Sequence, residues 1–272
     1  MNTERASPRY STIDLWEPGE ALDAMIEGQL AAVAAVHAAR AFLETAALAI
    51  EARLRSGGRL VYAGAGTSGR LAVQDGAELL PTFGWPAERL LVLLAGGDDA
   101  LLRAVEGAED DAEFAARLVR EHKLESQDVL IAVAASGTTP FTVGVLREAR
   151  RAGAATIGIA NNRDTPLLIE AEYPVLLDTG AEPIAGSTRM KAGTAQRVAL
   201  TVLSSLVMIR LGRVYRGLMV EIHGINAKLA RRSEDILMQL TGIDRKAARR
   251  TLSTTGGDLK AAIRQFDRGF IR

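Results

Sequence analysis

The feature that most constrains the fold is a series of short apolar segments, each followed by a polar loop and a stretch of helical pattern. Five such segments occupy the middle of the chain: Leu60–Ala63, Leu90–Leu94, Val129–Ala134, Thr156–Ile159 and Val175–Asp178. Strands that alternate with helices in this way form a parallel sheet with helices on both faces. Ligands of such sheets bind just beyond the carboxyl ends of the strands. The residues that follow each apolar segment are therefore the first candidates for a functional site.

Helical patterns precede this central region. Residues 1–17 are polar and predict an arm. Gly19–Arg55 is rich in alanine and has apolar residues at helical spacing, which predicts one long helix or two in tandem. We therefore expect an N-terminal arm and helix in residues 1–44, followed by a central α/β domain in residues 45–212.

Helical patterns also follow the last apolar segment. Met190–Leu211 carries Ala, Val and Leu on almost every side, which predicts a buried helix. Three more helices are expected in the charged tail, at Glu221–Leu240, Arg245–Leu252 and Asp258–Phe266. They predict a small C-terminal helical subdomain in residues 213–272.

The composition excludes several classes of function. The chain has 33 basic and 33 acidic residues, so no overall charge attracts nucleic acid or a membrane surface. It has no cysteine, which excludes disulfides, thiolate metal sites and thiol nucleophiles. The first residues lack the basic and apolar regions of a signal peptide, and we expect no apolar run long and charge-free enough to span a bilayer. A cytoplasmic location is expected.

The first candidate phosphate loop follows the first predicted strand. Its sequence, Gly64–Arg70, matches the dinucleotide pattern G-x-G-x-x-G, with Gly66 as the second glycine. Thr67 and Ser68 place two hydroxyls inside the loop, which suits one compact phosphate better than a dinucleotide. The nearest acidic candidate for a ribose partner after the second predicted strand is Asp98, which lies 29 residues past Gly69, whereas about 20 residues are expected. The alternative is a tight strand–helix turn in which the glycines are needed only for the backbone conformation and bind no ligand.

The second candidate loop follows the third predicted strand. It contains Ser136, Gly137, Thr138 and Thr139 ahead of Pro140, a residue that suits the first turn of a helix. The hydroxyls and free N–H groups of such a turn could hold a phosphate dianion with help from the helix dipole. The alternative is that the hydroxyls only cap the helix. Two hydroxyl-rich loops at the ends of adjacent central strands are a stronger indication than either loop alone.

The third candidate segment, residues 186–194, precedes the apolar helix. Its hydroxyl and basic side chains belong to Ser187, Thr188, Arg189 and Lys191. Basic residues at a helix start oppose the helix dipole, so they need an anion or a carboxylate nearby. A bound phosphate would meet that need, and so would pairing with a neighbour such as Glu182 or Asp178. Both alternatives stay open.

The first loop, the second loop and the third segment, in this order along the chain, resemble signature segments of N-acetylmuramic acid 6-phosphate etherases. The resemblance runs through essentially the whole chain and rests on Met1–Arg9, Gly64–Arg70, Ala104–Asp110, Ala134–Pro140 and Gly186–Thr194. The stretch Arg189–Gln196 resembles the etherases and their relatives, the glucokinase regulatory proteins. Gly242–Phe266 resembles the family's ubiquitin-associated-like helical bundle.

The resemblance implies a three-layer, flavodoxin-like sugar-isomerase (SIS) domain of α/β class, with N-terminal helices and a small C-terminal helical bundle. It implies a homodimer with its site near the subunit interface and a small sugar phosphate as ligand. The implied reaction removes the D-lactyl ether of N-acetylmuramic acid 6-phosphate and gives N-acetylglucosamine 6-phosphate and D-lactate, a step of amino-sugar metabolism and cell-wall recycling. No metal or organic cofactor is implied, and no nucleic acid or membrane.

Two glutamates match the family's functional positions. By this resemblance, Glu78 is the acid that protonates the departing lactate and then activates water. Glu109 is the base at C2 or a sugar contact, although the two roles could be exchanged, and Asn226 is a further candidate sugar contact. The chain departs from the family pattern around Glu78, where Ala77 and Leu79–Leu80 stand in place of Ser and of small or proline residues. This departure makes the surroundings of Glu78 more apolar and leaves the exact substrate open.

Three other functions stay open on these observations. A non-catalytic sugar-phosphate sensor like the glucokinase regulatory proteins would share the loops, but it needs no acid–base pair, so the presence of both Glu78 and Glu109 favours an enzyme. An aldose–ketose isomerase or a deaminase of the same fold is opposed by residues 186–196. An NAD-binding oxidoreductase is opposed by the hydroxyls of the first loop.

Overall fold

The computed structural model of the chain describes residues 1–221 and 227–266. The chain forms two compact units. The first consists of residues 1–76 and 88–205, and the second of residues 77–87 and the described residues from 206 onward.

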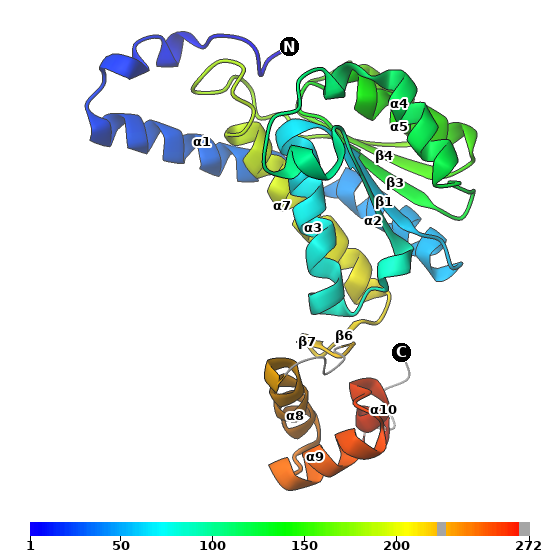
Figure 1. The fold of residues 1–272 in the computed structure, drawn as a ribbon. Helices are drawn as coiled ribbons and strands as arrows, with labels where there is room; N and C mark the ends of the chain where they lie inside the picture. Colours follow the sequence, from blue (N-terminus) through cyan, green and yellow to red (C-terminus); the bar gives the residue numbers. More distant parts are fainter. Residues whose placement is uncertain (222–226, 267–272) are drawn as a thin grey trace. The chain divides into compact units, whose positions relative to one another are not determined.

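The first unit is built on a five-stranded sheet in which every neighbouring pair of strands is parallel (Figure 1). The strand order is β2-β1-β3-β4-β5. The strands are β1 (Leu60–Gly64), β2 (Leu90–Leu94), β3 (Val129–Val133), β4 (Ala155–Ala160) and β5 (Tyr173–Leu176). Strands β1, β3 and β4 are buried along their whole length, which explains why their sequences are continuously apolar. The predicted parallel sheet is confirmed.

The fifth strand begins and ends two residues earlier than the predicted range Val175–Asp178. Tyr173 already pairs with Ile157 of β4. Pro174 is tolerated because β5 is an edge strand, where one side of the backbone has no strand to bond. Asp178 therefore lies in the loop beyond the strand, on the side where ligands of such sheets bind.

Helices cover both faces of the sheet and give the domain three layers (Figure 1). The helices of one face are α4 (Ala112–Glu121), α5 (Pro140–Arg151) and α6 (Pro166–Glu170). Those of the other face are α2 (Arg40–Arg55), the first part of α3 (Gly66–Phe83) and α7 (Lys191–Arg210). Burial of the strand side chains on both faces is the main source of stability, because each fully buried Val, Leu or Ile contributes about 1.5–3 kcal/mol.

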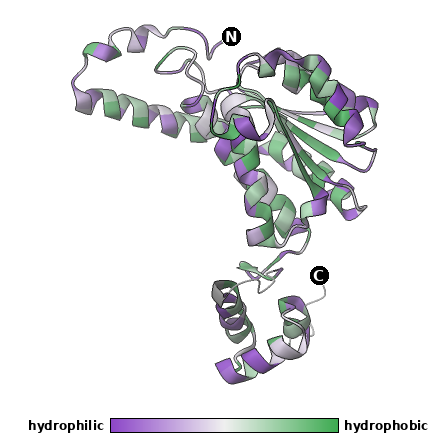
Figure 2. Ribbon diagram, in the orientation of Figure 1, coloured by the Kyte–Doolittle hydropathy of each residue, from purple (hydrophilic) through white to green (hydrophobic). Residues whose placement is uncertain are grey.

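The N-terminal stretch forms two helices in tandem. Helix α1 (Pro18–Ala38) and α2 meet at Ala39 with a bend of 58°. The arm in front of them contains two 3-10 turns, η1 (Pro8–Tyr10) and η2 (Ile13–Leu15). Helix α2 packs on the sheet, whereas α1 shows hydrophobic bands along its length (Figure 2). Four apolar side chains on one stripe of α1 are 47–67% exposed: Leu22, Ile26, Leu30 and Val33.

Helix α7 is less buried than its sequence predicted. Val202, Leu206 and Ile209 are 46%, 37% and 48% exposed, so the expectation of a helix buried on every side is wrong for this side. By length and composition α7 is also apolar enough to cross a bilayer. This finding corrects the expectation that no apolar run of the chain is long and charge-free enough to do so. More than half of this stretch is buried inside the protein, as in a core helix.

Three 3-10 turns lie in the connections around β2. They are η3 (Ala87–Arg89), η4 (Gly97–Leu101) and η5 (Ala108–Asp110). The connection after β2 is therefore a series of short turns before α4 begins, and the last of these turns carries Glu109.

The second unit contains a short hairpin and a bundle of helices. The hairpin, β6 (Val214–Tyr215) with β7 (Leu218–Met219), was not expected, because strands of two residues show no periodicity. The helices are α8 (Ala227–Thr241), α9 (Arg245–Thr254) and α10 (Leu259–Arg264). They pack around an apolar core that includes Leu237, Ala248 and Ile263. The predicted helical tail is confirmed, although Glu221 lies outside α8 and Phe266 lies beyond α10.

Candidate functional site

The first loop joins β1 to α3 through closely packed glycines. Gly66 has a φ of +52°, a conformation that favours glycine. A Cβ atom on Gly69 would lie 2.7 Å from the carbonyl oxygen of Gly64. Geometry alone therefore explains these glycines. Thr67 and Ser68 are polar groups that the turn itself does not require, and they lie in the first turn of α3, where N–H groups have no helical acceptor.

The second loop joins β3 to α5, and β3 is the neighbour of β1 in the sheet, as predicted. Ser136 Oγ accepts the N–H of Thr138 at 3.2 Å and lies 3.3 Å from Thr139 Oγ1. Thr139 is the N-cap residue of α5, but its side chain makes no capping hydrogen bond. Gly137 has a φ of +72°, and a Cβ atom there would collide with Thr165. The hydroxyl of Thr139 is thus not used as a cap.

The third segment leads into α7, which begins at Lys191. The buried carboxylate of Glu182 accepts the backbone N–H groups of Lys191 at 2.9 Å and Ala192 at 2.8 Å. Lys191 Nζ donates to the carbonyl oxygen of Ala181 at 2.8 Å. Burial raises the pKa of Glu182 and lowers the pKa of Lys191, and the attraction between the two charges opposes both shifts. The two alternatives for the basic residues were a bound anion and a nearby carboxylate. For Lys191, the structure shows that a carboxylate, that of Glu182, lies nearby.

The first loop and the third segment lie side by side. A Cβ atom on Gly193 would lie 3.6 Å from Thr67 Cγ2 and 3.2 Å from the carbonyl oxygen of Thr188. Ser187 and Thr188 are half-buried, while Arg189 is exposed. The structure thus brings the hydroxyl-bearing residues of these two segments to the same edge of the sheet.

Two buried asparagines at the carboxyl end of β4 connect further segments to this edge, and neither was predicted from the sequence as a site residue. Asn161 Nδ2 donates to the carbonyl oxygen of Leu177, and Asn161 Oδ1 accepts from Gln196 Nε2, both at 2.9 Å. Asn162 Nδ2 donates to the carbonyl oxygen of Ala135, in the second loop, at 2.8 Å. The rule that directs attention to residues just after a strand was sufficient to find them, because two amides in a row follow an apolar segment.

Glu109 lies on η5 and is exposed. This turn packs against α5, the helix that begins at the second loop. Arg70, at the first loop, donates to the carbonyl oxygens of Ala100 at 2.8 Å and Arg103 at 3.2 Å in the preceding connection. The segment that carries Glu109 is therefore held to the first loop and to the helix of the second.

Glu78 lies on α3, about three turns after the helix begins, and is exposed. It belongs to residues 77–87 of the second unit. Leu79 is 1% exposed and Leu80 is 45% exposed. The apolar character expected around Glu78 is thus contributed at the surface by Leu80, while Leu79 is part of the core. Asn226 lies outside the described residues.

A buried polar network joins β1, α3 and α7. Tyr62 donates its hydroxyl to Asp75 at 2.8 Å, and Ser204 donates to the other carboxylate oxygen at 3.3 Å. Arg197 lies 3.7 Å from the same carboxylate. Burial raises the pKa of Asp75, and the hydrogen bonds from Tyr62 and Ser204 and the charge of Arg197 oppose that rise. The network ties together the two helices that begin at the first loop and the third segment.

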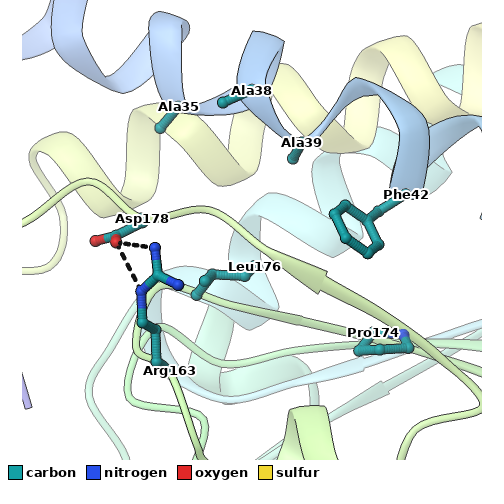
Figure 3. Close-up of a pocket in the computed structure, with 8 residues that line it drawn as sticks. All are labelled: Ala35, Ala38, Ala39, Phe42, Arg163, Pro174, Leu176 and Asp178. Atoms are coloured by element: carbon teal, nitrogen blue, oxygen red, sulfur yellow. Dashed lines mark hydrogen bonds and ion pairs between the residues drawn. The ribbon is translucent and has the colours of Figure 1, made fainter.

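A pocket of about 350 Å³ lies beside the edge strand β5 (Figure 3). Ala39 and Phe42, at the bend between α1 and α2, line it together with Arg163 and Asp178, which form an ion pair at 2.9 Å. None of the predicted site residues is among the residues that line it. Its mostly apolar lining suits a hydrophobic group rather than a phosphate dianion.

Family models and solved structures agree with this architecture. The model "Glucokinase regulatory protein N-terminal SIS domain" matches residues 43–150, and the model "SIS domain" matches residues 108–206. A phosphoheptose isomerase from Francisella tularensis has a TM-score of 0.54 at 19% identity, over 71% of this chain and 100% of that chain. A phosphoheptose isomerase from Neisseria gonorrhoeae has a TM-score of 0.52 at 14% identity, over 70% and 97%. These similarities show the SIS fold.

Other relatives are much more similar in sequence. An N-acetylmuramic acid 6-phosphate etherase from Deinococcus radiodurans is 51% identical over 261 residues, which cover 96% of this chain and 86% of the relative. The etherase from Streptomyces coelicolor is 42% identical over 264 residues, 97% of this chain and 85% of the relative. The etherase from Lactococcus lactis is 40% identical over 264 residues, 97% and 89%. The chain belongs to the N-acetylmuramic acid 6-phosphate etherase family.

Proposed function

We propose that the protein removes the D-lactyl ether from N-acetylmuramic acid 6-phosphate and releases N-acetylglucosamine 6-phosphate and D-lactate. The observation that carries this proposal is the 51% identity, over 96% of the chain, to a relative named as an etherase of this substrate. The meeting of the first loop and the third segment at the carboxyl edge of the sheet supports it, because such edges bind ligands. The protein would then be a carbon–oxygen lyase.

The reaction needs a base, an acid and a water molecule. In the open-chain sugar the aldehyde acidifies the proton on C2, so a carboxylate can remove it. The C3–O bond then breaks while a carboxyl group protonates the departing lactate oxygen, and water adds to C3 in the last step. We assign the C2 base to Glu109, and we assign the acid that later activates water to Glu78, with the reverse assignment as the alternative. Both side chains are exposed and therefore accessible to a ligand.

In this proposal, hydroxyls and N–H groups hold the phosphate of the substrate. The residues that would bind the phosphate come from all three segments: Gly66, Thr67, Ser68, Ser136, Gly137, Thr138, Thr139, Ser187 and Thr188. Lys191 adds a positive charge nearby, and the carbonyl oxygen of Ala181 uses one of the three donors of its ammonium group. Asn226 completes the proposed site as a sugar contact.

A second candidate function is a sugar-phosphate regulator without catalysis. The observation that favours it is the match of residues 43–150 to the domain of glucokinase regulatory proteins. Such a protein needs the phosphate loops but no acid–base pair. The presence of Glu78 and Glu109 therefore favours the lyase.

We also infer a cytoplasmic homodimer with its site near the subunit interface. The stripe of Leu22, Ile26, Leu30 and Val33 on α1 supports the dimer, because a contiguous apolar surface of this kind marks an interaction site. A second copy carries the same stripe, so two copies related by a twofold axis can cover each other. A role in cell-wall recycling follows from the proposed substrate.

The test is an assay of D-lactate after the protein is mixed with N-acetylmuramic acid 6-phosphate. We expect D-lactate and N-acetylglucosamine 6-phosphate in equal amounts, and no release from N-acetylmuramic acid that lacks the phosphate. Binding of the phosphorylated sugar without release of lactate would support the regulator instead. Conversion of an aldose phosphate into a ketose phosphate would support an isomerase.

A further inference from the structure

The N-terminal segment is anchored at the same edge of the sheet as the candidate phosphate loops. Thr3 is completely buried, although its neighbours along the chain are exposed. Its carbonyl oxygen accepts the N–H of Gly186 at 3.0 Å, which ties the segment to the third loop region. The carboxylate of Glu4 lies there too, since a Cβ atom on Gly186 would be 2.9 Å from Glu4 Oε2.

The side chain of Asn162 holds the same segment through a second set of hydrogen bonds. Its Oδ1 accepts the backbone N–H groups of Asn2 at 2.6 Å and Thr3 at 3.3 Å. Its Nδ2 donates to Thr3 Oγ1 at 2.9 Å and to the carbonyl oxygen of Ala135 at 2.8 Å. One buried amide therefore connects the start of the chain with the second loop, and Thr3 extends this connection to the third segment.

We propose that Asn162 and Thr3 form a clamp that fixes the second loop and the third segment relative to each other, so that residues 1–4 form a wall of the sugar-phosphate site. A segment outside helices and strands is fixed in one place only when contacts hold it, because ordering it costs conformational entropy. Four hydrogen bonds hold residues 2 and 3 in place, three of them to Asn162 and one to Gly186 at the third segment. The clamp depends on the proposed function for the identity of the ligand.

The hydrogen bonds define the role of Asn162 as positioning. A side-chain amide has two N–H donors and two acceptor positions, and all four are used within the protein. Asn162 therefore has no group left for the substrate. Because loop spacing decides how well hydroxyls from separate segments fit one phosphate, loss of the clamp should weaken binding more than it slows the chemical step.

The experiment compares Thr3→Val and Thr3→Ser with Ser7→Ala, a control on the same arm whose hydroxyl makes no capping hydrogen bond. The measurements are kcat and KM for N-acetylmuramic acid 6-phosphate and the Kd of N-acetylglucosamine 6-phosphate by calorimetry. Thr3→Val keeps the shape but removes the acceptor of Asn162, so KM and Kd should rise about 5- to 10-fold with kcat nearly unchanged. Thr3→Ser keeps the hydroxyl that accepts from Asn162, so its KM and Kd should equal those of the wild type.

A double-mutant cycle with Asn162→Ala completes the test. Thr3→Val should add little to the rise in Kd that Asn162→Ala causes, because the two residues act as a unit. Additive effects would overturn the clamp, and so would a Kd for Thr3→Val equal to that of Ser7→Ala. If Asn162→Ala does not fold, the Thr3 variants decide alone.

The same data separate the clamp from the proposed function. If the wild-type protein binds the sugar phosphate but releases no lactate, the proposed function fails while the comparison of Kd values still decides the clamp. If lactate is released and Thr3→Val leaves KM and Kd unchanged, the clamp fails and the function stands. A wild-type protein that binds no sugar phosphate would overturn both.

Discussion

The carboxylate of Glu182 accepts the backbone N–H of Lys191 at 2.9 Å and so occupies the N-terminus of α7 from within the chain. The same carboxylate accepts the N–H of Ala192 at 2.8 Å. A helix N-terminus attracts anions, and here a buried side chain already satisfies it. A phosphate at the third segment would therefore depend on the hydroxyls of Ser187 and Thr188, on the charge of Lys191 and on the neighbouring first loop.

Glu182→Ala should lower the free energy of unfolding by about 2–4 kcal/mol, because two buried N–H groups lose their acceptor and the ammonium group of Lys191 loses a nearby negative charge. Asp111→Ala is the matched control, since Asp111 is an exposed N-cap that accepts the N–H of Phe114 at 2.8 Å. Its loss should cost about 1 kcal/mol. Urea unfolding measures both values, and equal losses would contradict the special role of Glu182.

Gly69→Ala should destabilise the protein by about 1–3 kcal/mol. The added Cβ would lie 2.4 Å from Leu94 Cδ1 and 2.7 Å from the carbonyl oxygen of Gly64, so strand and helix must move apart. Gly19→Ala in α1 is the control, because nothing lies within 4 Å of the new Cβ. The control should stabilise the helix by about 0.5–1 kcal/mol. Thermal unfolding distinguishes the two, and a Gly69→Ala variant as stable as the wild type would refute the close packing of the first loop.

The sheet could be predicted from the sequence because strands buried on both faces are continuously apolar, as in Val129–Val133. The first and last residues of β5 could not be predicted, because an edge strand also accommodates the partly exposed Tyr173 and the proline that follows it. The hairpin at 214–219 was missed because it is too short to show a period. The domain limits after residues 44 and 212 stay a prediction.

The candidate site could be predicted only in part. The hydroxyl-bearing loops are visible in the sequence because each directly follows an apolar strand. The connection between Thr3 and Asn162 is not visible, because it joins positions 159 residues apart through hydrogen bonds that no local pattern specifies. A carboxylate near Lys191 was one of two alternatives in the sequence, and the folded chain shows that Glu182 accepts the backbone N–H of this residue.

The buried carboxyl group of Asp75 should make stability fall as the pH rises above the ordinary range of carboxyl titration. Burial raises the pKa of Asp75, so the folded protein holds this proton more tightly than the unfolded chain does. This contribution is complete below the unfolded pKa and is lost as the pH rises through the raised folded pKa. Asp75→Asn should remove it. The free energy of unfolding of the wild type, relative to the variant, should therefore be larger near about pH 4 than near about pH 8. Urea unfolding at both pH values measures this, and a difference independent of pH would contradict it.

Leu30→Glu should convert the proposed dimer into monomers. Leu30 is 67% exposed on the apolar stripe of α1, and a carboxylate there would be buried without a partner in a twofold contact. We expect dimerisation to weaken by at least about 100-fold. Ala31→Glu adds the same charge at an exposed position off the stripe and should leave the dimer intact. Analytical ultracentrifugation measures the dissociation constants, and a monomeric wild-type protein would refute the dimer.

Glu109→Gln should reduce kcat by about 10²- to 10⁴-fold, the usual contribution of a general acid or base. Because Glu109 is exposed, the free energy of unfolding should change by less than about 0.5 kcal/mol. Glu106→Gln is the control, because Glu106 is an exposed glutamate in the same segment. Its kcat should equal that of the wild type. Full activity of Glu109→Gln would remove this residue from the chemistry.

Exchange of the C2 proton of N-acetylglucosamine 6-phosphate in heavy water distinguishes the roles of the two glutamates. Removal of this proton needs the base but not the acid that protonates lactate, so Glu78→Gln should still catalyse the exchange while it releases no lactate. Glu109→Gln should lose the exchange and the release of lactate together. The opposite pattern would give Glu78 the role of base and Glu109 that of acid, because the carboxylate whose loss abolishes exchange is the one that removes the proton on C2.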